Sequence, residues 1–311
     1  MVRMTILAIG AIGLCLSASA AEPPSSSPEL AQADKLLQEG KLDEAIAILD
    51  RVVVKDPKNP HPFASRGVAH LSRGDMDKAI ADLTAAIALD PKNPALFVNR
   101  GVAYGSKGDL DREIADYTEA LRLDPRQADA LGNRGAAYAN KGQTANAIAD
   151  HTAAIALRPD DAMFHFNRGN AYRHNKEFEK AIADCTTALR LKPDYLDALL
   201  NRAIAYGLSN QHDKELADYA RAIALAPKDL RGYFNRGLAH AAAGRAKDAL
   251  ADFDQVIRLQ PKFGGAYYQR ALVHDKLGDK AKADADRAEA KRLGYEPHDP
   301  NCKDPNCKHK H

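Results

Sequence analysis

Residues 94–127 read PALFVNRGVAYGSKGDLDREIADYTEALRLDPRQ, and the chain repeats this pattern along most of its length. The triplet Asn99-Arg100-Gly101 within this stretch returns every 34 residues, in the same or a closely related form. The related triplets begin at Ser65, Asn133, Asn167, Asn201, Asn235 and Gln269. A fixed period of this size indicates a stack of similar supersecondary units, and it favours a binding function over catalysis.

Each unit is predicted to contain two amphipathic helices. In residues 94–127 the first helix places Phe97, Gly101 and Tyr104 on one face. Gly108-Asp109 then breaks this helix and caps the next one. Asp124-Pro125 ends the second helix, because the residue before a proline avoids the helical conformation.

Within the unit, glycine recurs at position 8, tyrosine at 11, alanine at 20 and 27, and proline at 32. This pattern resembles the tetratricopeptide repeat (TPR), with units that start at residues 26, 60, 94, 128, 162, 196, 230 and 264. The resemblance implies an all-α fold, a right-handed superhelical solenoid of about eight helix-turn-helix repeats over residues 29–294. Glu113 and Glu215 depart from the pattern, since each replaces the small residue at position 20.

Arginine recurs at position 7 wherever aspartate recurs at position 23, and the first unit lacks both. We therefore expect each arginine to pair with an aspartate between packed helices, as a charge-assisted pair with fork geometry. The alternative is a row of free arginines that binds acidic ligands. The arginines are Arg66, Arg100, Arg134, Arg168, Arg202, Arg236 and Arg270.

The resemblance to TPR proteins places position 6 on the first helix, which lines the concave groove of such arrays. The asparagines at this position are predicted to hold the backbone of a bound peptide, since an amide both donates and accepts. They are Asn99, Asn133, Asn167, Asn201 and Asn235. A similar ladder occurs in the TPR superhelix of O-linked N-acetylglucosamine transferases. Alternatively, these amides are simply exposed on the helix or bond to the neighbouring unit.

Apolar residues at positions 5 and 9 are predicted to form pockets in the same groove or, alternatively, to pack between units. The candidates are Phe166, Leu200, Phe234 and Leu238. No unit has the position 5 lysine with which carboxylate-clamp TPRs hold chaperone tails. A segment with apolar side chains therefore fits better than a C-terminal carboxylate.

The predicted function is a non-catalytic scaffold with a protein or peptide partner and no cofactor. The chain has 44 basic and 42 acidic residues, a net charge of +2, and no long basic block. This balance gives no electrostatic support for nucleic-acid binding. No arrangement of serine, histidine and carboxylates typical of an enzyme stands out from the repeat.

The first 20 residues are predicted to be a signal peptide that directs export, to the periplasm of a bacterium. Arg3 precedes a short apolar stretch, and Ala18-Ser19-Ala20 offers a cleavage site. The apolar stretch is shorter than the roughly 20 residues of a membrane-spanning helix, so a cleaved signal is favoured over an anchor. Leu14 before Cys15 argues against a lipoprotein. Residues 21–28 are predicted to be a Pro/Ser linker.

Residues 295–311 are predicted to form a disordered tail that contains Asp-Pro-Asn-Cys-Lys twice. The tail offers thiol and imidazole ligands for Zn or Cu, at His298, Cys302, Cys307, His309 and His311. Alternatively, the two cysteines form a local disulfide. Two other functions thus stay open: a metal-handling protein that uses this tail, and a targeting subunit of an envelope enzyme complex.

Overall fold

The computed structural model describes residues 27–295, and all regular secondary structure in this range is α-helical. The predicted all-α repeat fold is confirmed for these residues. The helices are α1 (Pro28–Gln38), α2 (Leu42–Lys55), α3 (Pro60–Arg73), α4 (Met76–Leu89), α5 (Pro94–Ser106), α6 (Leu110–Leu123), α7 (Ala128–Asn140), α8 (Thr144–Leu157), α9 (Ala162–His174), α10 (Phe178–Leu191), α11 (Leu196–Leu208), α12 (His212–Leu225), α13 (Leu230–Ala242), α14 (Ala246–Leu259), α15 (Gly264–Lys276) and α16 (Lys280–Arg292).

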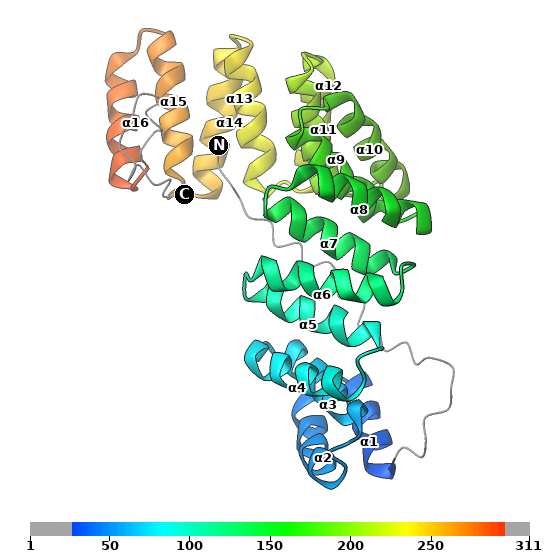
Figure 1. Ribbon diagram of the computed structural model, residues 1–311. Coiled ribbons are helices and arrows are strands. Elements are labelled where there is room, and N and C mark those ends of the chain that lie inside the picture. Colours follow the sequence, from blue (N-terminus) through cyan, green and yellow to red (C-terminus); the bar gives the residue numbers. More distant parts are fainter. Residues whose placement is uncertain (1–26, 296–311) are drawn as a thin grey trace, which may run out of the picture. The chain divides into compact units, whose positions relative to one another are not determined.

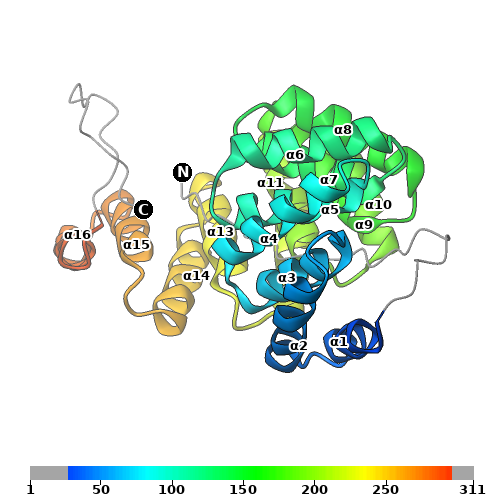
Figure 2. The ribbon, with the colours of Figure 1, turned by 60° about the horizontal axis from the view of Figure 1, so that its bottom comes forward.

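Residues 27–171 form one compact part of the chain. The helices pack as pairs, α1 on α2, α3 on α4, α5 on α6 and α7 on α8 (Figure 1). The second helix of each of the first three pairs also packs on the first helix of the next pair. The first helices α1, α3 and α5 contact one another in order, and Figure 2 shows α1, α2 and α3 side by side. Each unit is thus covered by its neighbours, as in a repeat stack.

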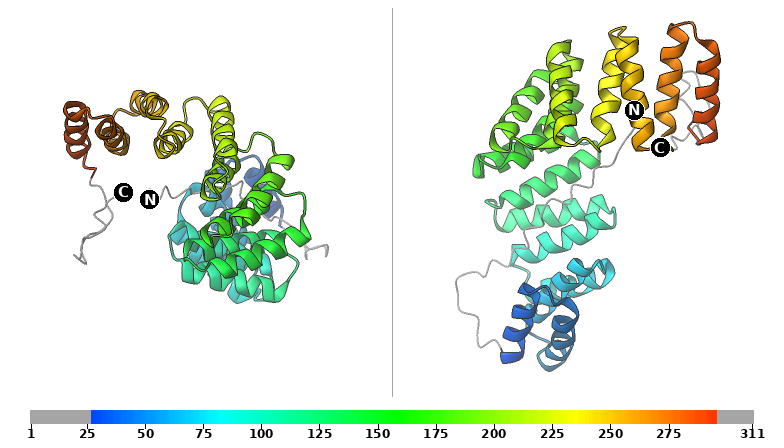
Figure 3. Two further views of the ribbon diagram at one scale, coloured as in Figure 1. Left: turned by 90° about the horizontal axis from the view of Figure 1, so that it is seen from above. Right: turned by 180° about the vertical axis from the view of Figure 1, so that it is seen from behind.

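Residues 172–295 form the second compact part and repeat the same arrangement. The pairs are α11 with α12, α13 with α14 and α15 with α16. Figure 3 shows these last two pairs both end-on and along their axes. The first helices α11, α13 and α15 again contact one another in order. A continuous row of first helices therefore runs through this part.

The turn between the helices of a pair has the predicted chemistry. After α5, Gly108 has a φ of 76°, a conformation that side chains with a Cβ disfavour. The side chain of Asp109 then caps α6 by accepting a hydrogen bond from the N–H of Arg112. Lys176 and Asn210 occupy the equivalent position in two other units, also at positive φ. These contacts confirm the predicted boundary between the two helices.

The glycine at position 8 makes room for the side chain at position 24 of the same unit. A Cβ on Gly101 would lie 2.9 Å from the ring of Tyr117, which is fully buried. A Cβ on Gly67 would likewise lie 2.8 Å from the side chain of Leu83. The larger residue at position 24 thus fills the space opposite the glycine, one turn after the alanine at position 20.

The ends of the described range differ by one residue from the predicted boundaries. Helix α1 begins at Pro28, where the Ser27 side chain caps it, rather than at residue 29. Tyr295 belongs to the folded part, since its N–H donates to the carbonyl of Ala290 and its ring lies 5.3 Å from that of Tyr268. None of the helices in residues 27–295 is both long and apolar enough to cross a membrane. The predictions for residues 1–26 and 296–311 lie outside the described residues.

Candidate functional site

The predicted asparagine ladder is less exposed than a peptide-binding surface requires. Asn99 and Asn201 are buried, with exposed fractions of 7% and 9%. Asn133, Asn167 and Asn235 are half-buried. Only the latter three therefore offer much side-chain surface to a ligand.

Two of the five asparagines have partners in the preceding unit. The amide of Asn133 hydrogen-bonds to the hydroxyl of Tyr117 on α6. The side-chain oxygen of Asn201 accepts a hydrogen bond from Nε of Arg173 at 2.9 Å. Ser65, which holds the same position of its unit, donates to Asp34 at 2.9 Å. At these positions the alternative interpretation holds, since the polar group joins neighbouring units.

The four apolar groove candidates serve largely in packing. Phe166 and Leu200 are buried, with exposed fractions of 9% and 6%. Phe234 packs edge-on against Phe263 at 5.2 Å, and both Phe234 and Leu238 pack on the core of their part of the chain. Neighbouring side chains therefore cover Phe166 and Leu200, whereas Phe234 and Leu238 are half-buried, and a role of these residues in binding stays a prediction.

A partly exposed row nevertheless remains on the first helices. We call the residues at positions 6 and 9 of these helices the first-helix face. Since positions three apart lie on the same side of a helix, each helix contributes one polar and one aliphatic group in most units. Its half-buried members are Asp34, Val102, Asn133, Ala136, Asn167 and Asn170 in residues 27–171, and Ile204, Asn235, Leu238, Gln269 and Leu272 in residues 172–295.

The predicted arginine–aspartate pairs are confirmed at six units. Nε and Nη2 of Arg100 donate to the two carboxylate oxygens of Asp116 at 2.9 and 2.7 Å. The same fork joins Arg66 to Asp82, Arg134 to Asp150, Arg202 to Asp218, Arg236 to Asp252 and Arg270 to Asp286. The hydrogen bond to Asp116 raises the pKa of Arg100, which keeps the guanidinium charged.

Five of these six guanidinium groups also reach the preceding unit. Nη1 of Arg100 donates to the hydroxyl of Thr84 on α4 at 3.1 Å, so one arginine joins α4, α5 and α6. Arg134 makes the same contact with Thr118, and Arg202 with Thr186. Because the three nitrogens of each of these arginines already have acceptors, a free row for acidic ligands is excluded at these units.

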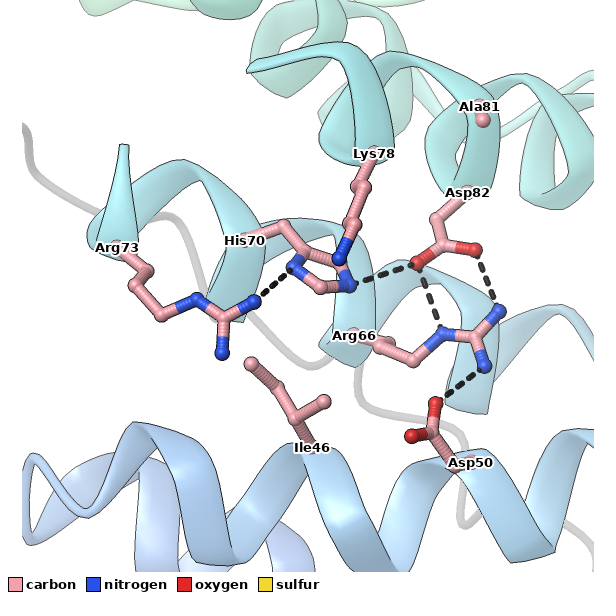
Figure 4. A pocket seen from close by; sticks show the side chains of 8 residues that line it. All are labelled: Ile46, Asp50, Arg66, His70, Arg73, Lys78, Ala81 and Asp82. Carbon is pink, nitrogen blue, oxygen red and sulfur yellow. Dashed lines mark hydrogen bonds and ion pairs between the residues drawn. The ribbon is translucent and has the colours of Figure 1, made fainter. Parts of the chain in front are cut away.

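Figure 4 shows a pocket of about 460 Å³ between the first and second pairs, at a point where His70 replaces the tyrosine of other units. Its arginines are paired with carboxylates. Arg66 bonds to Asp82 and Asp50, and Arg73 bonds to Asp75 and Asp43. Burial lowers the pKa of His70, which favours a neutral ring. This network stabilises the junction and presents no activated nucleophile.

The buried cysteine and the possible metal ligands of residues 27–295 give no sign of a reactive site either. Burial raises the pKa of the Cys185 thiol to about 12, which keeps it protonated and unreactive. Within residues 27–295 no group of three or more His, Cys, Asp or Glu side chains is placed to hold a metal ion. The candidate ligands His298, Cys302, Cys307, His309 and His311 lie outside the described residues.

Glu113 and Glu215, unexplained by the repeat pattern, share a structural solution. The Glu113 carboxylate fills the space beside Gly105, where a Cβ would lie 2.6 Å from it. Gly207 makes the same space for Glu215, at 2.5 Å. Glycine at position 12 thus compensates for glutamate at position 20. The two glycines were the sequence signal that could have explained the pair.

Burial raises the pKa of Glu113 to about 7, from an ordinary value of 4.5. A carboxyl with a raised pKa in the folded state destabilises the fold as pH rises from the unfolded value through the folded one. Glu113→Gln is therefore expected to raise the free energy of unfolding by about 1–2 kcal/mol at pH 8, less than the full shift implies because the side chain is partly exposed. At pH 5 the gain should be much smaller. Urea unfolding followed by circular dichroism at both pH values measures this, and equal gains would contradict it.

These features define an all-α protein of stacked helix pairs, in six of which an arginine–aspartate pair joins the two helices of the unit. Tetratricopeptide repeat family models match residues 30–94, 94–127, 116–149, 162–195 and 230–263. The chain belongs to the tetratricopeptide repeat family, whose arrays serve in general as protein-interaction scaffolds rather than enzymes.

Solved structures support the same fold. A TPR protein from Parabacteroides merdae is 23% identical with a TM-score of 0.64, over 76% of this chain and 93% of that one. The C-terminal part of a TPR protein from Cytophaga hutchinsonii is 24% identical with a TM-score of 0.63, over 77% and 98%. YrrB, described as a TPR protein with an unusual peptide-binding site, is 18% identical with a TM-score of 0.54, over 59% and 95%. No curated protein matches this chain.

Proposed function

We propose that this protein is a non-catalytic scaffold that binds a segment of a partner protein on its first-helix face. The observation that carries the proposal is the regular alternation on α13 and α15, where Asn235 and Leu238 recur as Gln269 and Leu272. Both pairs are half-buried, and the two helices contact each other. An ordered row of this kind is more than packing of a single unit requires.

The chemistry of the row fits a polypeptide in an extended form. An amide side chain satisfies both the N–H and the C=O of a peptide backbone, and the aliphatic groups take apolar side chains. An acidic ligand is disfavoured, because the arginines next to this face are already paired with aspartates. The peptide-binding site named for YrrB gives a precedent in a similar fold.

Asn235 is the ladder member we assign to ligand binding, since it is half-buried and no hydrogen bond to another residue of 27–295 engages it. Asn133 contributes on α7, although its amide also contacts Tyr117. A metal-handling tail, a role in an envelope enzyme complex and export to the periplasm stay predictions from the sequence.

The proposal is tested with an array of short random peptides and the purified protein. Asn235→Ala and Leu272→Glu are each expected to lower the affinity for the bound peptides by about tenfold. Asn235→Ala removes hydrogen bonds to the peptide backbone, and Leu272→Glu places a charge against an apolar group. Ala251→Glu on α14 is the control, since Ala251 is exposed and lies on a second helix. Circular dichroism establishes that each variant is folded.

Two results would contradict the proposal. One is the absence of any bound peptide. The other is an equal loss of affinity for Ala251→Glu and Leu272→Glu, which would place the binding surface elsewhere.

A further inference from the structure

A combination of three residues occurs at the same positions of two units. Gly105, Glu113 and Tyr117 lie at positions 12, 20 and 24 of one unit, and Gly207, Glu215 and Tyr219 repeat them in the other. The remaining units have alanine at position 20, as Ala45, Ala79, Ala147, Ala181, Ala249 and Ala283. The glutamate at position 20 is therefore a departure from the repeat, and it occurs together with glycine at position 12 and tyrosine at position 24.

The two carboxylates differ in their partners. Glu215 accepts a hydrogen bond from Nδ1 of His212 at 3.0 Å, one helical turn earlier on α12. On α6 the equivalent residue is Leu110, which cannot donate. Among residues 27–295 no hydrogen bond or ion pair engages the Glu113 carboxylate. The Glu215 carboxylate thus has a hydrogen-bond partner within its own helix, and the Glu113 carboxylate has none among the described residues.

The cations near Glu113 are already engaged. Arg112, its neighbour in sequence, pairs with Asp109 and lies 4.5 Å from the ring centre of Tyr104. Lys141, after α7, pairs with Asp111. Neither can turn to Glu113 without breaking a contact, so the compensating charge has no internal source nearby.

The open carboxylate lies beside polar groups of the first-helix face. Tyr117 is one turn after Glu113 on α6, and its hydroxyl bonds to the Asn133 amide on α7. Burial and the charge of the Glu113 carboxylate, which fills the space beside Gly105, raise the pKa of Tyr117. Glu113 and the Asn133 amide therefore both lie near that hydroxyl.

We propose that Glu113, with the Asn133 side-chain oxygen, binds a positively charged group of the partner segment, the ammonium of a lysine or the guanidinium of an arginine. The inference rests on the proposed function and adds the chemistry of one subsite. A carboxylate with a neutral oxygen nearby matches such a cation, because charge-assisted hydrogen bonds are the strong ones. The glutamate is half-buried, so it is both shielded from water and reachable.

The pKa of Glu113 supports this assignment. Burial alone raises it, to about 7, and no neighbouring cation offsets the effect. Glu215, in contrast, has a hydrogen-bond partner in His212. A bound cation would be such a partner for Glu113, and binding should lower the pKa of its carboxyl.

The test uses the array of random peptides and a peptide that the protein selects from it. Peptides bound by the unaltered protein are expected to share a lysine or arginine at a fixed place. Replacing that residue by norleucine, which lacks the charge, should weaken binding by about tenfold. With Glu113→Gln the same replacement should change affinity by less than about twofold, since the two groups then no longer couple.

Two further variants sharpen the result. Glu215→Gln is the matched control, and it should leave the selected peptides and their charge preference unchanged. Leu110→His copies the internal partner of Glu215 onto α6, so it should suppress the charge preference while the fold is retained. Carbon-13 NMR of the Glu113 carboxyl group follows its pKa with and without the selected peptide.

The outcomes separate the two proposals. Bound peptides without a charge preference, or the same loss on charge removal in Glu113→Gln as in the unaltered protein, would overturn the cation subsite and leave the scaffold function intact. If no peptide binds to any variant, the scaffold function itself fails and the subsite fails with it.

Discussion

Asp116→Ala is expected to lower the free energy of unfolding by about 3 kcal/mol, because it removes one partner of a buried ion pair. The reason is the position of the pair. The Asp116 side chain is 8% exposed, and its removal leaves the Arg100 guanidinium half-enclosed between three helices with only Thr84 as an acceptor. Urea unfolding followed by circular dichroism measures the loss, and a constant m-value shows that the same cooperative unit unfolds.

The neighbouring pair of Lys107 and Asp77 provides the control. The Asp77 side chain is 86% exposed, so Asp77→Ala should cost about 0.5 kcal/mol or less. The double variant Arg100→Met/Asp116→Leu should lose less than Asp116→Ala, because it leaves no uncompensated charge. Similar losses for Asp77→Ala and Asp116→Ala would show that the buried fork contributes no more than a surface contact.

Gly132→Ala is expected to lower the free energy of unfolding by about 2 kcal/mol, although alanine is the better helix former. A Cβ at Gly132 on α7 would lie 2.4 Å from a ring carbon of Phe164. Phe164 is 1% exposed and packed on all sides, so its ring cannot move away without disturbing the core cluster that it shares with Phe97 and Tyr117. The unfolding midpoint in urea reports the change.

Gly105→Ala is the matched control for this substitution. Its Cβ would also be too close to a neighbour, at 2.6 Å, but that neighbour is the end of the flexible Glu113 side chain. We expect a change between zero and a gain of about 1 kcal/mol, since the carboxylate swings outward and the helix gains propensity. A large loss here would mean that Glu113 is held as rigidly as Phe164.

Much of the fold follows from residues that act within one unit. The turn at Gly108 and Asp109 was predictable because backbone conformation and capping depend on a few consecutive residues. The pairing of Arg100 with Asp116 was predictable for another reason, since the two residues appear and disappear together from unit to unit. Two residues that occur together in every unit, and are both missing from one, indicate a contact even when its geometry is unknown.

The fate of the groove candidates was not predictable in this way. Asn133 and Asn235 are the same residue at the same position, and each follows a unit with a tyrosine at position 24. The Asn133 amide bonds to its tyrosine, whereas the Asn235 amide makes no such bond to Tyr219. Leu200 and Leu238 were equal candidates by type, but Leu200 is buried and Leu238 is half-buried. Exposure depends on the side chains that neighbouring helices bring to each position, and these vary between units.

The amino-acid sequence by itself determined the unit of this protein: its length, its two helices, its turn and its internal ion pair, because these depend on local backbone preferences and on residues repeated in step. Only the tertiary structure decided which polar groups are left over for a partner. Glu113 and Glu215 follow different residues one turn earlier, Leu110 and His212, and the sequence shows this difference. Only the folded helices show that His212 reaches its glutamate and that both carboxylates lie beside a glycine of the preceding helix. A side chain is available for binding only when no neighbour has satisfied it, and that is a property of the packed array.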